Sequence, residues 1–153
     1  MGKPPPIVLG HAVTRSELEE YAAHYLGRLG DDEDAYFALI EAPHEIIAFL
    51  ALAFRSEAGP QKRSMILNVI WQHRQPSAIP SLREGLWDTS PIVWKQALDG
   101  LVTIGGQESI STIEAANSRS FDCEADAREF RASLDEALLQ LRGGFQVGKP
   151  TVA

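Results

Sequence analysis

The chain has 153 residues, of which 44% are hydrophobic and 23% charged, and these values predict one ordinary globular domain. Its net charge of −7 repels phosphate backbones, so we expect a protein partner and no nucleic-acid ligand. The charge suits a basic partner, but ordinary solubility charge is the favoured explanation. The single cysteine, Cys123, excludes an internal disulfide, and with neither a signal-peptide pattern nor a membrane-spanning run we expect a cytoplasmic protein without membrane contact.

The N-terminal part predicts an extended arm followed by two helices. Residues 1–13 are rich in proline, which favours extended chain. Thr14 and Glu17 have the spacing of a capping box, in which a hydroxyl and a carboxylate satisfy two helix-end amides, so a capping helix is expected over 14–29. Acidic residues at 31–34 complement the dipole at the start of the next helix. The apolar residues of that helix are Tyr36, Phe37, Leu39 and Ile40.

The remaining chain predicts further helices divided by proline and glycine. Residues 44–55 are apolar almost all round, which is typical of a helix buried on several sides. Pro60 and Pro91 each start a helix, and Gly105 permits a left-handed turn after the second. Asp122 is expected to cap the last helix. The predicted units are an arm over 1–13, one domain over 14–142 and a flexible tail over 143–153. Within the domain we expect a capping helix at 14–29, repeats at 31–57, 60–86 and 91–117, and a second capping helix at 122–141.

Residues 60–86 and 91–117 share one pattern at an offset of 31 residues. The offset places Leu67 on Leu98 and Ile70 on Leu101. A fixed period of about 20–50 residues is typical of stacked repeat units. About eight helices joined by short connections, with no convincing strand, therefore predict an all-α protein built of antiparallel helical hairpins.

The second of these units carries a spaced set of residues that occurs in a known family. The set is Asp88, Pro91, Val93, Ala97, Leu98, Leu101, Ile104, Gly105, Glu108, Ile110 and Ile113. It resembles the HEAT repeat, in the short type found in phycobilisome-lyase-like proteins. The resemblance implies a right-handed α-α superhelix, an armadillo-like solenoid, that works as a scaffold and binds proteins along its second helices. A few relatives are lyases or modifying enzymes.

The outward positions of the second helices form the expected interaction face, and a rigid scaffold would hold them preformed. Trp94 stands where related repeats have a solvent-facing arginine, so it is either an exposed interface anchor or a side chain packed against Trp71 or a neighbouring helix. Trp87 belongs either to the core between repeats or to the rim. The predicted protein-binding residues are Arg55, Ser81, Arg83, Glu84, Trp87, Trp94, Glu108 and Thr112.

The sequence contains no recognisable catalytic or phosphate-binding motif. The stretch at 31–34 lacks the glycine and glutamate of a calcium loop, and acidic neighbours disfavour a reactive thiolate at Cys123. We therefore expect no catalytic residue, no cofactor and no metal site. A lyase-like or modifying activity is kept as an alternative, and it requires His44, His73 and Tyr36 to converge.

The predicted function is that of a non-catalytic protein-binding scaffold. An immunity or antitoxin protein that neutralises a basic toxin is a more specific alternative, because small size and negative charge suit electrostatic capture. A regulatory or assembly subunit is a further alternative. The sequence does not distinguish a concave from a convex binding face.

Overall fold

The structure, a computed structural model, describes residues 13–143, and these form helices and connecting turns only. The predicted all-α class is confirmed for this part of the chain. The predicted arm and tail lie outside the described residues, except for residues 13 and 143 at its edges. The α-helices are α1 (Arg15–Leu26), α2 (Glu33–Glu41), α3 (Ile47–Ser56), α4 (Pro60–Gln72), α5 (Ile79–Leu86), α6 (Pro91–Ile104), α7 (Gly106–Ala116) and α8 (Glu124–Leu141), and the short 3-10 helices are η1 (His44–Ile46) and η2 (Pro76–Ala78).

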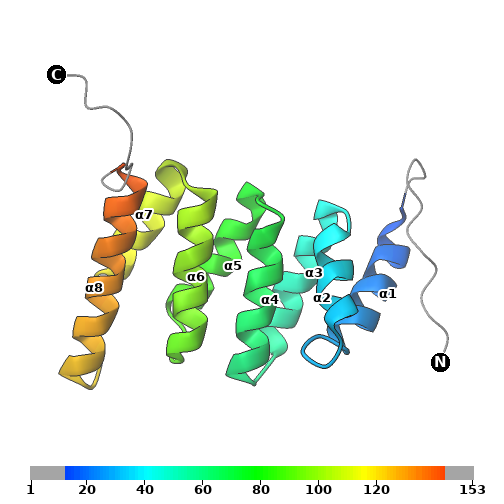
Figure 1. Ribbon diagram of the computed structural model, residues 1–153, viewed down its shortest axis with the longest axis horizontal. Helices are drawn as coiled ribbons and strands as arrows, with labels where there is room; N and C mark the ends of the chain where they lie inside the picture. Colours follow the sequence, from blue (N-terminus) through cyan, green and yellow to red (C-terminus); the bar gives the residue numbers. More distant parts are fainter. Residues whose placement is uncertain (1–12, 144–153) are drawn as a thin grey trace.

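The helices stand side by side in a row that begins with α1 and ends with α8 (Figure 1). One layer contains α2, α4, α6 and α8, in which each helix contacts the next. The other layer, behind it in this view, contains α3, α5 and α7. From α2 to α8 the chain thus alternates between the layers, as antiparallel hairpins require.

The core lies between the two layers and runs the length of the row. Both members of the repeated pairs are buried, Leu67 with Leu98 and Ile70 with Leu101, so the sequence repeat is a repeat of core positions. The largest fully buried side chains are Leu39, Ile46, Leu50, Phe54, Ile66, Leu67, Ile70, Leu82, Leu86, Leu101, Ile113 and Phe130.

Two helical glycines permit the close approach of α4, α5 and α6. A Cβ atom at Gly100 would lie 2.7 Å from Cδ1 of Trp71 and 2.8 Å from Cδ2 of Leu82. At Gly85 it would lie 2.5 Å from Cδ1 of Leu67. These separations are shorter than van der Waals contact, so the absence of a side chain at both positions sets the spacing of the helices.

The predicted N-cap is correct for the first helix, α1, and wrong for the last helix, α8. The Thr14 hydroxyl accepts a hydrogen bond from the Glu17 amide and the Glu17 carboxylate accepts one from the Thr14 amide, both at 3.1 Å, which confirms the capping box. The prediction that Asp122 caps α8 is wrong, because the N-cap residue is Cys123, whose side chain makes no capping hydrogen bond. Glu124 and Asp126 in the first turn supply the negative charge that the helix dipole favours.

The apolar segment at 44–55 is less enclosed than its composition suggests. Ile47, Phe49, Leu50 and Phe54 of α3 are buried, but Leu52 is exposed. One face of α3, which includes Leu52 and Arg55, therefore remains open to solvent. Within residues 13–143 no single helix is long and apolar enough to cross a membrane. The segments Glu33–Glu41 and His44–Ser56 together have the length and apolar composition of a membrane span, but the chain bends by 113° between them.

Candidate protein-interaction surfaces

Trp94 is not an exposed anchor. Its side chain is only 2% exposed and its ring packs edge-on against Phe130 of α8, with centroids 4.9 Å apart. The alternative of packing against a neighbouring helix is the one observed. The repeat register alone could not reveal this contact, because Phe130 belongs to the terminal helix that follows the repeats.

Ser81 and Thr112 were predicted to face outward, and the structure places both in the interior. The Thr112 hydroxyl donates to the carbonyl of Glu108, one turn earlier in α7, at 2.8 Å. Ser81 on α5 is likewise buried, and α5 contacts α7. Small polar side chains let these helices pack closely, so both residues belong to the scaffold and not to a binding face.

The four predicted charged residues are exposed, and they pair with one another. Arg55 of α3 makes a bidentate contact with Glu84 of α5, with the shortest distance 2.7 Å. Arg83 of α5 lies 3.8 Å from Glu108 of α7. The second-layer face therefore carries largely compensated charge. Trp87, at the end of α5, is 46% exposed and belongs to the rim.

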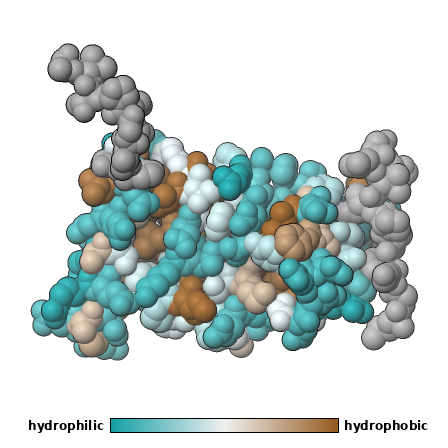
Figure 2. All heavy atoms as spheres, viewed as in Figure 1, coloured by the Kyte–Doolittle hydropathy of each residue, from teal (hydrophilic) through white to brown (hydrophobic). Residues whose placement is uncertain are grey.

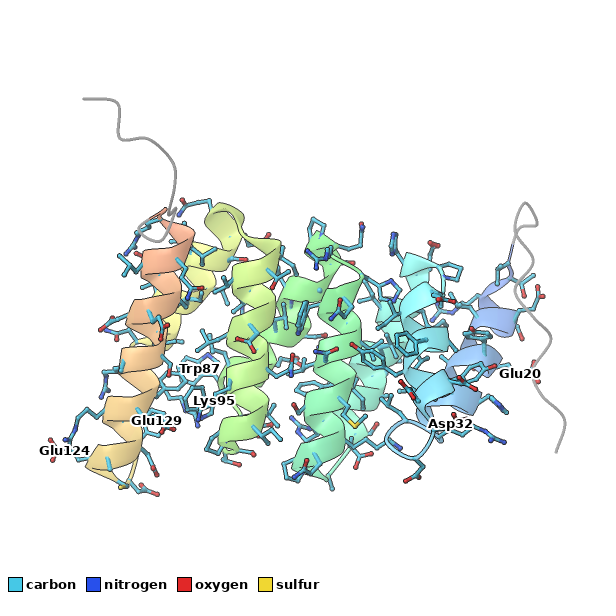
Figure 3. All side chains as sticks on the ribbon, viewed as in Figure 1. Glu20, Asp32, Trp87, Lys95, Glu124 and Glu129 are labelled. Carbon is cyan, nitrogen blue, oxygen red and sulfur yellow. The ribbon has the colours of Figure 1, made fainter. Side chains whose placement is uncertain are left out.

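The uncompensated charge lies at the other end of the sequence. Residues 14–45 contain nine acidic and two basic side chains, whereas residues 46–143 contain twelve acidic and ten basic ones. Among the described residues, five ion pairs join positions from Arg55 onward, and Glu19, Glu20, Asp31 and Glu33 take part in none of them. The end of the row formed by α1 and α2 is therefore strongly acidic; Glu20 and Asp32 mark it in Figure 3.

An apolar cleft opens at this acidic end, between the start of α2 and α4. It has a volume of about 400 Å³. Phe37 lines it with 48% of its surface exposed, and its ring meets that of Tyr36 edge-to-face at 5.4 Å and 78°. The remaining lining residues are Gly30, Asp31, Asp32, Glu33 and Met65.

The backbone explains why the carboxylates stand beside the apolar wall. Gly30 has a φ of +102°, a conformation that favours glycine, and it turns the chain between α1 and α2. Asp32 then caps α2, its carboxylate accepting from the Asp34 amide at 2.9 Å. The acidic run at 31–34 and the apolar Phe37 lie close together in the sequence, and this adjacency was the signal for the cleft.

Tyr36 is held in place by a hydrogen-bond network that crosses three helices. Its hydroxyl donates to the Asn68 side chain at 2.5 Å, and burial raises the pKa of the phenol. The Asn68 amide donates to Gln96 at 3.0 Å, and Gln96 also accepts from the Trp71 indole at 2.6 Å. The network fixes one wall of the cleft to α4 and α6.

A second groove lies on the same layer between α6 and α8, with a volume of 610 Å³. Leu98, Val102 and Ala137 form its apolar part, and Figure 2 shows hydrophobic surface in this region. Asp99 lines it, and desolvation raises the pKa of this carboxyl group. Basic and acidic side chains both occur at its edge, so its charge favours no particular ligand.

His44 and His73 lie in direct contact, with their Nδ1 atoms 2.9 Å apart. His73 Nε2 is 2.9 Å from the Leu39 carbonyl oxygen, which can only accept, so this nitrogen donates and His73 Nδ1 accepts from His44. Burial lowers the pKa of His73, and His44 adds to the effect. The pair ties the end of α4 to α2.

The Tyr36 hydroxyl is bonded to Asn68, and among the described residues no contact between Tyr36 and either histidine is found. Among the described residues no group of three His, Cys, Asp or Glu side chains could hold a metal ion. No protein-family model, curated protein or solved structure matches this chain.

Proposed function

We propose that the protein is a non-catalytic interaction module of the HEAT type, a right-handed α-α superhelix, that binds a basic protein partner. The two-layered row of hairpins and the repeated core positions support the architecture. The uneven charge supports the partner: nine acidic and two basic residues at 14–45 produce a field that attracts a basic surface.

The binding face follows from the way in which charges are compensated. On the second layer, Arg55 neutralises Glu84 and Arg83 lies near Glu108, so an incoming basic group would compete with an existing ion pair. At the α1–α2 end, Glu19, Glu20, Asp31 and Glu33 take part in none of the ion pairs found among the described residues. The acidic end, and not the second-helix ridge, is therefore the proposed binding face.

Two variants of equal net charge test this proposal. The first replaces Glu19, Glu20, Asp31 and Glu33 by their amides; the second does the same to Glu124, Asp126, Asp135 and Glu136 on α8. Proteins captured from a lysate of the native host are compared for each variant and the unchanged chain. We expect basic proteins to be captured by the unchanged chain and by the α8 variant but not by the first variant. Equal retention by both variants, or no basic protein retained, would contradict the proposal.

The same charge distribution favours the immunity or antitoxin function as a more specific form of this proposal. A toxin that acts on nucleic acid requires a basic surface, and an acidic face can block it. The test is co-expression with a basic toxin encoded beside this gene. The unchanged chain should restore growth and the α1–α2 charge variant should not; growth restored equally by both would exclude this form.

A further inference from the structure

We infer that the cleft between α2 and α4 binds an arginine side chain of the basic partner. The inference rests on the proposed function and identifies the group that this face recognises. It starts from the cleft's composition: an apolar wall of Tyr36, Phe37 and Met65 stands beside the carboxylates of Asp31, Asp32 and Glu33.

The wall suits the stem and the plane of an arginine. Phe37 is 48% exposed, so part of its ring is open to a ligand. Tyr36 stands edge-to-face with it at 78°, and the two rings form adjoining walls of different orientation. A guanidinium stacks on an aromatic face through cation–π attraction, while its aliphatic stem packs on apolar surface such as Met65.

The carboxylates suit the charged end of the same side chain. A guanidinium presents five N–H donors in a fixed plane and binds carboxylates in a bidentate manner. Asp31 and Glu33 are exposed at the edge of the cleft, and neither takes part in an ion pair found among the described residues. An ammonium group matches this combination less well, because it is a compact and strongly hydrated point charge.

The cleft is also preformed. The Tyr36 hydroxyl is fixed by Asn68, which is itself fixed by Gln96 on α6. Met65 lies under the turn, with its Sδ atom 3.5 Å from the Cβ position that a side chain at Gly30 would occupy. A wall whose side chains are already ordered loses little conformational freedom when a ligand binds.

Met65 offers a direct probe, because the chain contains only two methionines, Met1 and Met65. The full chain is labelled with ¹³C at the methionine methyl groups and titrated with a short oligoarginine peptide. We expect a saturable shift of the Met65 signal with the Met1 signal as an internal reference. A stationary Met65 signal during binding detected by calorimetry would overturn the inference and leave the acidic face as the binding region.

Variants at position 37 separate ring stacking from charge. Phe37→Leu keeps an apolar side chain but removes the π face, and we expect affinity for oligoarginine to fall about three- to tenfold. Phe37→Tyr should retain it. Leu139→Ala, at an exposed apolar position on α8, is the matched control and should bind as the unchanged chain does. Equal affinity of Phe37→Leu and the unchanged chain would overturn the inference.

A charge comparison completes the test. Asp31→Asn with Glu33→Gln should weaken oligoarginine binding, whereas Glu124→Gln with Asp126→Asn should not. The unchanged chain should bind oligoarginine more tightly than oligolysine of the same length; equal affinities, or no binding of either peptide, would overturn the arginine assignment. The capture experiment above tests the proposed function separately, because the retention of a whole protein depends on the partner's entire surface and not on this cleft alone.

Discussion

Arg63 and Asp88 form an ion pair of 2.6 Å that joins the start of α4 to the loop between α5 and α6. The guanidinium also donates to the carbonyl groups of Phe54 and Glu57, and it lies over the Phe54 ring at 4.2 Å. The other Asp88 oxygen accepts from the Ser90 amide at 2.9 Å. One arginine thus connects the end of α3, the start of α4 and the turn before α6.

Asp88→Ala should destabilise the protein by about 2–4 kcal/mol, because it leaves a largely buried guanidinium without its carboxylate. Urea unfolding followed by circular dichroism measures the change. Glu84→Ala is the control, since the Arg55–Glu84 pair is exposed to solvent and should contribute little to stability. Similar losses in the two variants would show that the Arg63 contacts do not hold the turn.

Gly100→Ala should cost about 1–3 kcal/mol, because the new Cβ would lie within 2.8 Å of atoms of Trp71 and Leu82. Gly27→Ala is the matched control. A Cβ there would meet only backbone oxygens at 3.5 Å and 3.6 Å, and its φ of −64° suits alanine. Thermal unfolding should therefore show a lower Tm for Gly100→Ala alone; an unchanged Tm would mean that α4 and α6 can separate without loss.

Ser109→Ala should stabilise the protein by about 1 kcal/mol. The Ser109 hydroxyl is fully buried and has no hydrogen-bond partner among the described residues. Replacing it removes an unsatisfied polar group and introduces a better helix former. Thr112→Val provides the contrast, because the Thr112 hydroxyl is bonded to Glu108 and its loss should not stabilise. Chemical denaturation of both variants measures the difference, and a destabilised Ser109→Ala would refute it.

Stability should decrease as the pH falls below about 6.5, the ordinary pKa of histidine. Burial lowers the pKa of His73 in the folded state, so between this lower value and about 6.5 the unfolded chain binds more protons. Stability therefore rises with pH through that interval. His73→Gln can still donate to the Leu39 carbonyl but does not titrate, and its stability should depend less on pH. His24→Gln serves as the control; equal pH dependence of His73→Gln and the unchanged chain would contradict the assignment.

The helical architecture was accessible from the sequence because core residues and helix-breaking residues repeat. Pro60 and Pro91 begin their helices, and Leu101 is buried as its register predicts. Trp94 was ambiguous because its exposure depends on α8, whose packing on α6 is a contact between separate units. Periodicity within one helix describes a face, and it does not say what covers that face.

The candidate site was harder to predict because it depends on contacts distant in sequence. Phe37 and Met65 meet in one cleft although they lie on different helices, and the acidic run alone gave no indication of Met65. The pairing of Arg55 with Glu84 likewise joins two separate helices. A count of charges in the sequence does not show which of them form ion pairs. For this reason the proposed binding face is the α1–α2 end and not the second helices.

The unequal charge of the two ends also makes the molecule an electric dipole directed along its row of helices. In the field of a highly charged partner such an object experiences a torque, so it rotates as it approaches. The α1–α2 end would then face a basic partner before any contact forms, which reduces the orientational search that slows most protein association. The same torque turns this end away from an acidic surface.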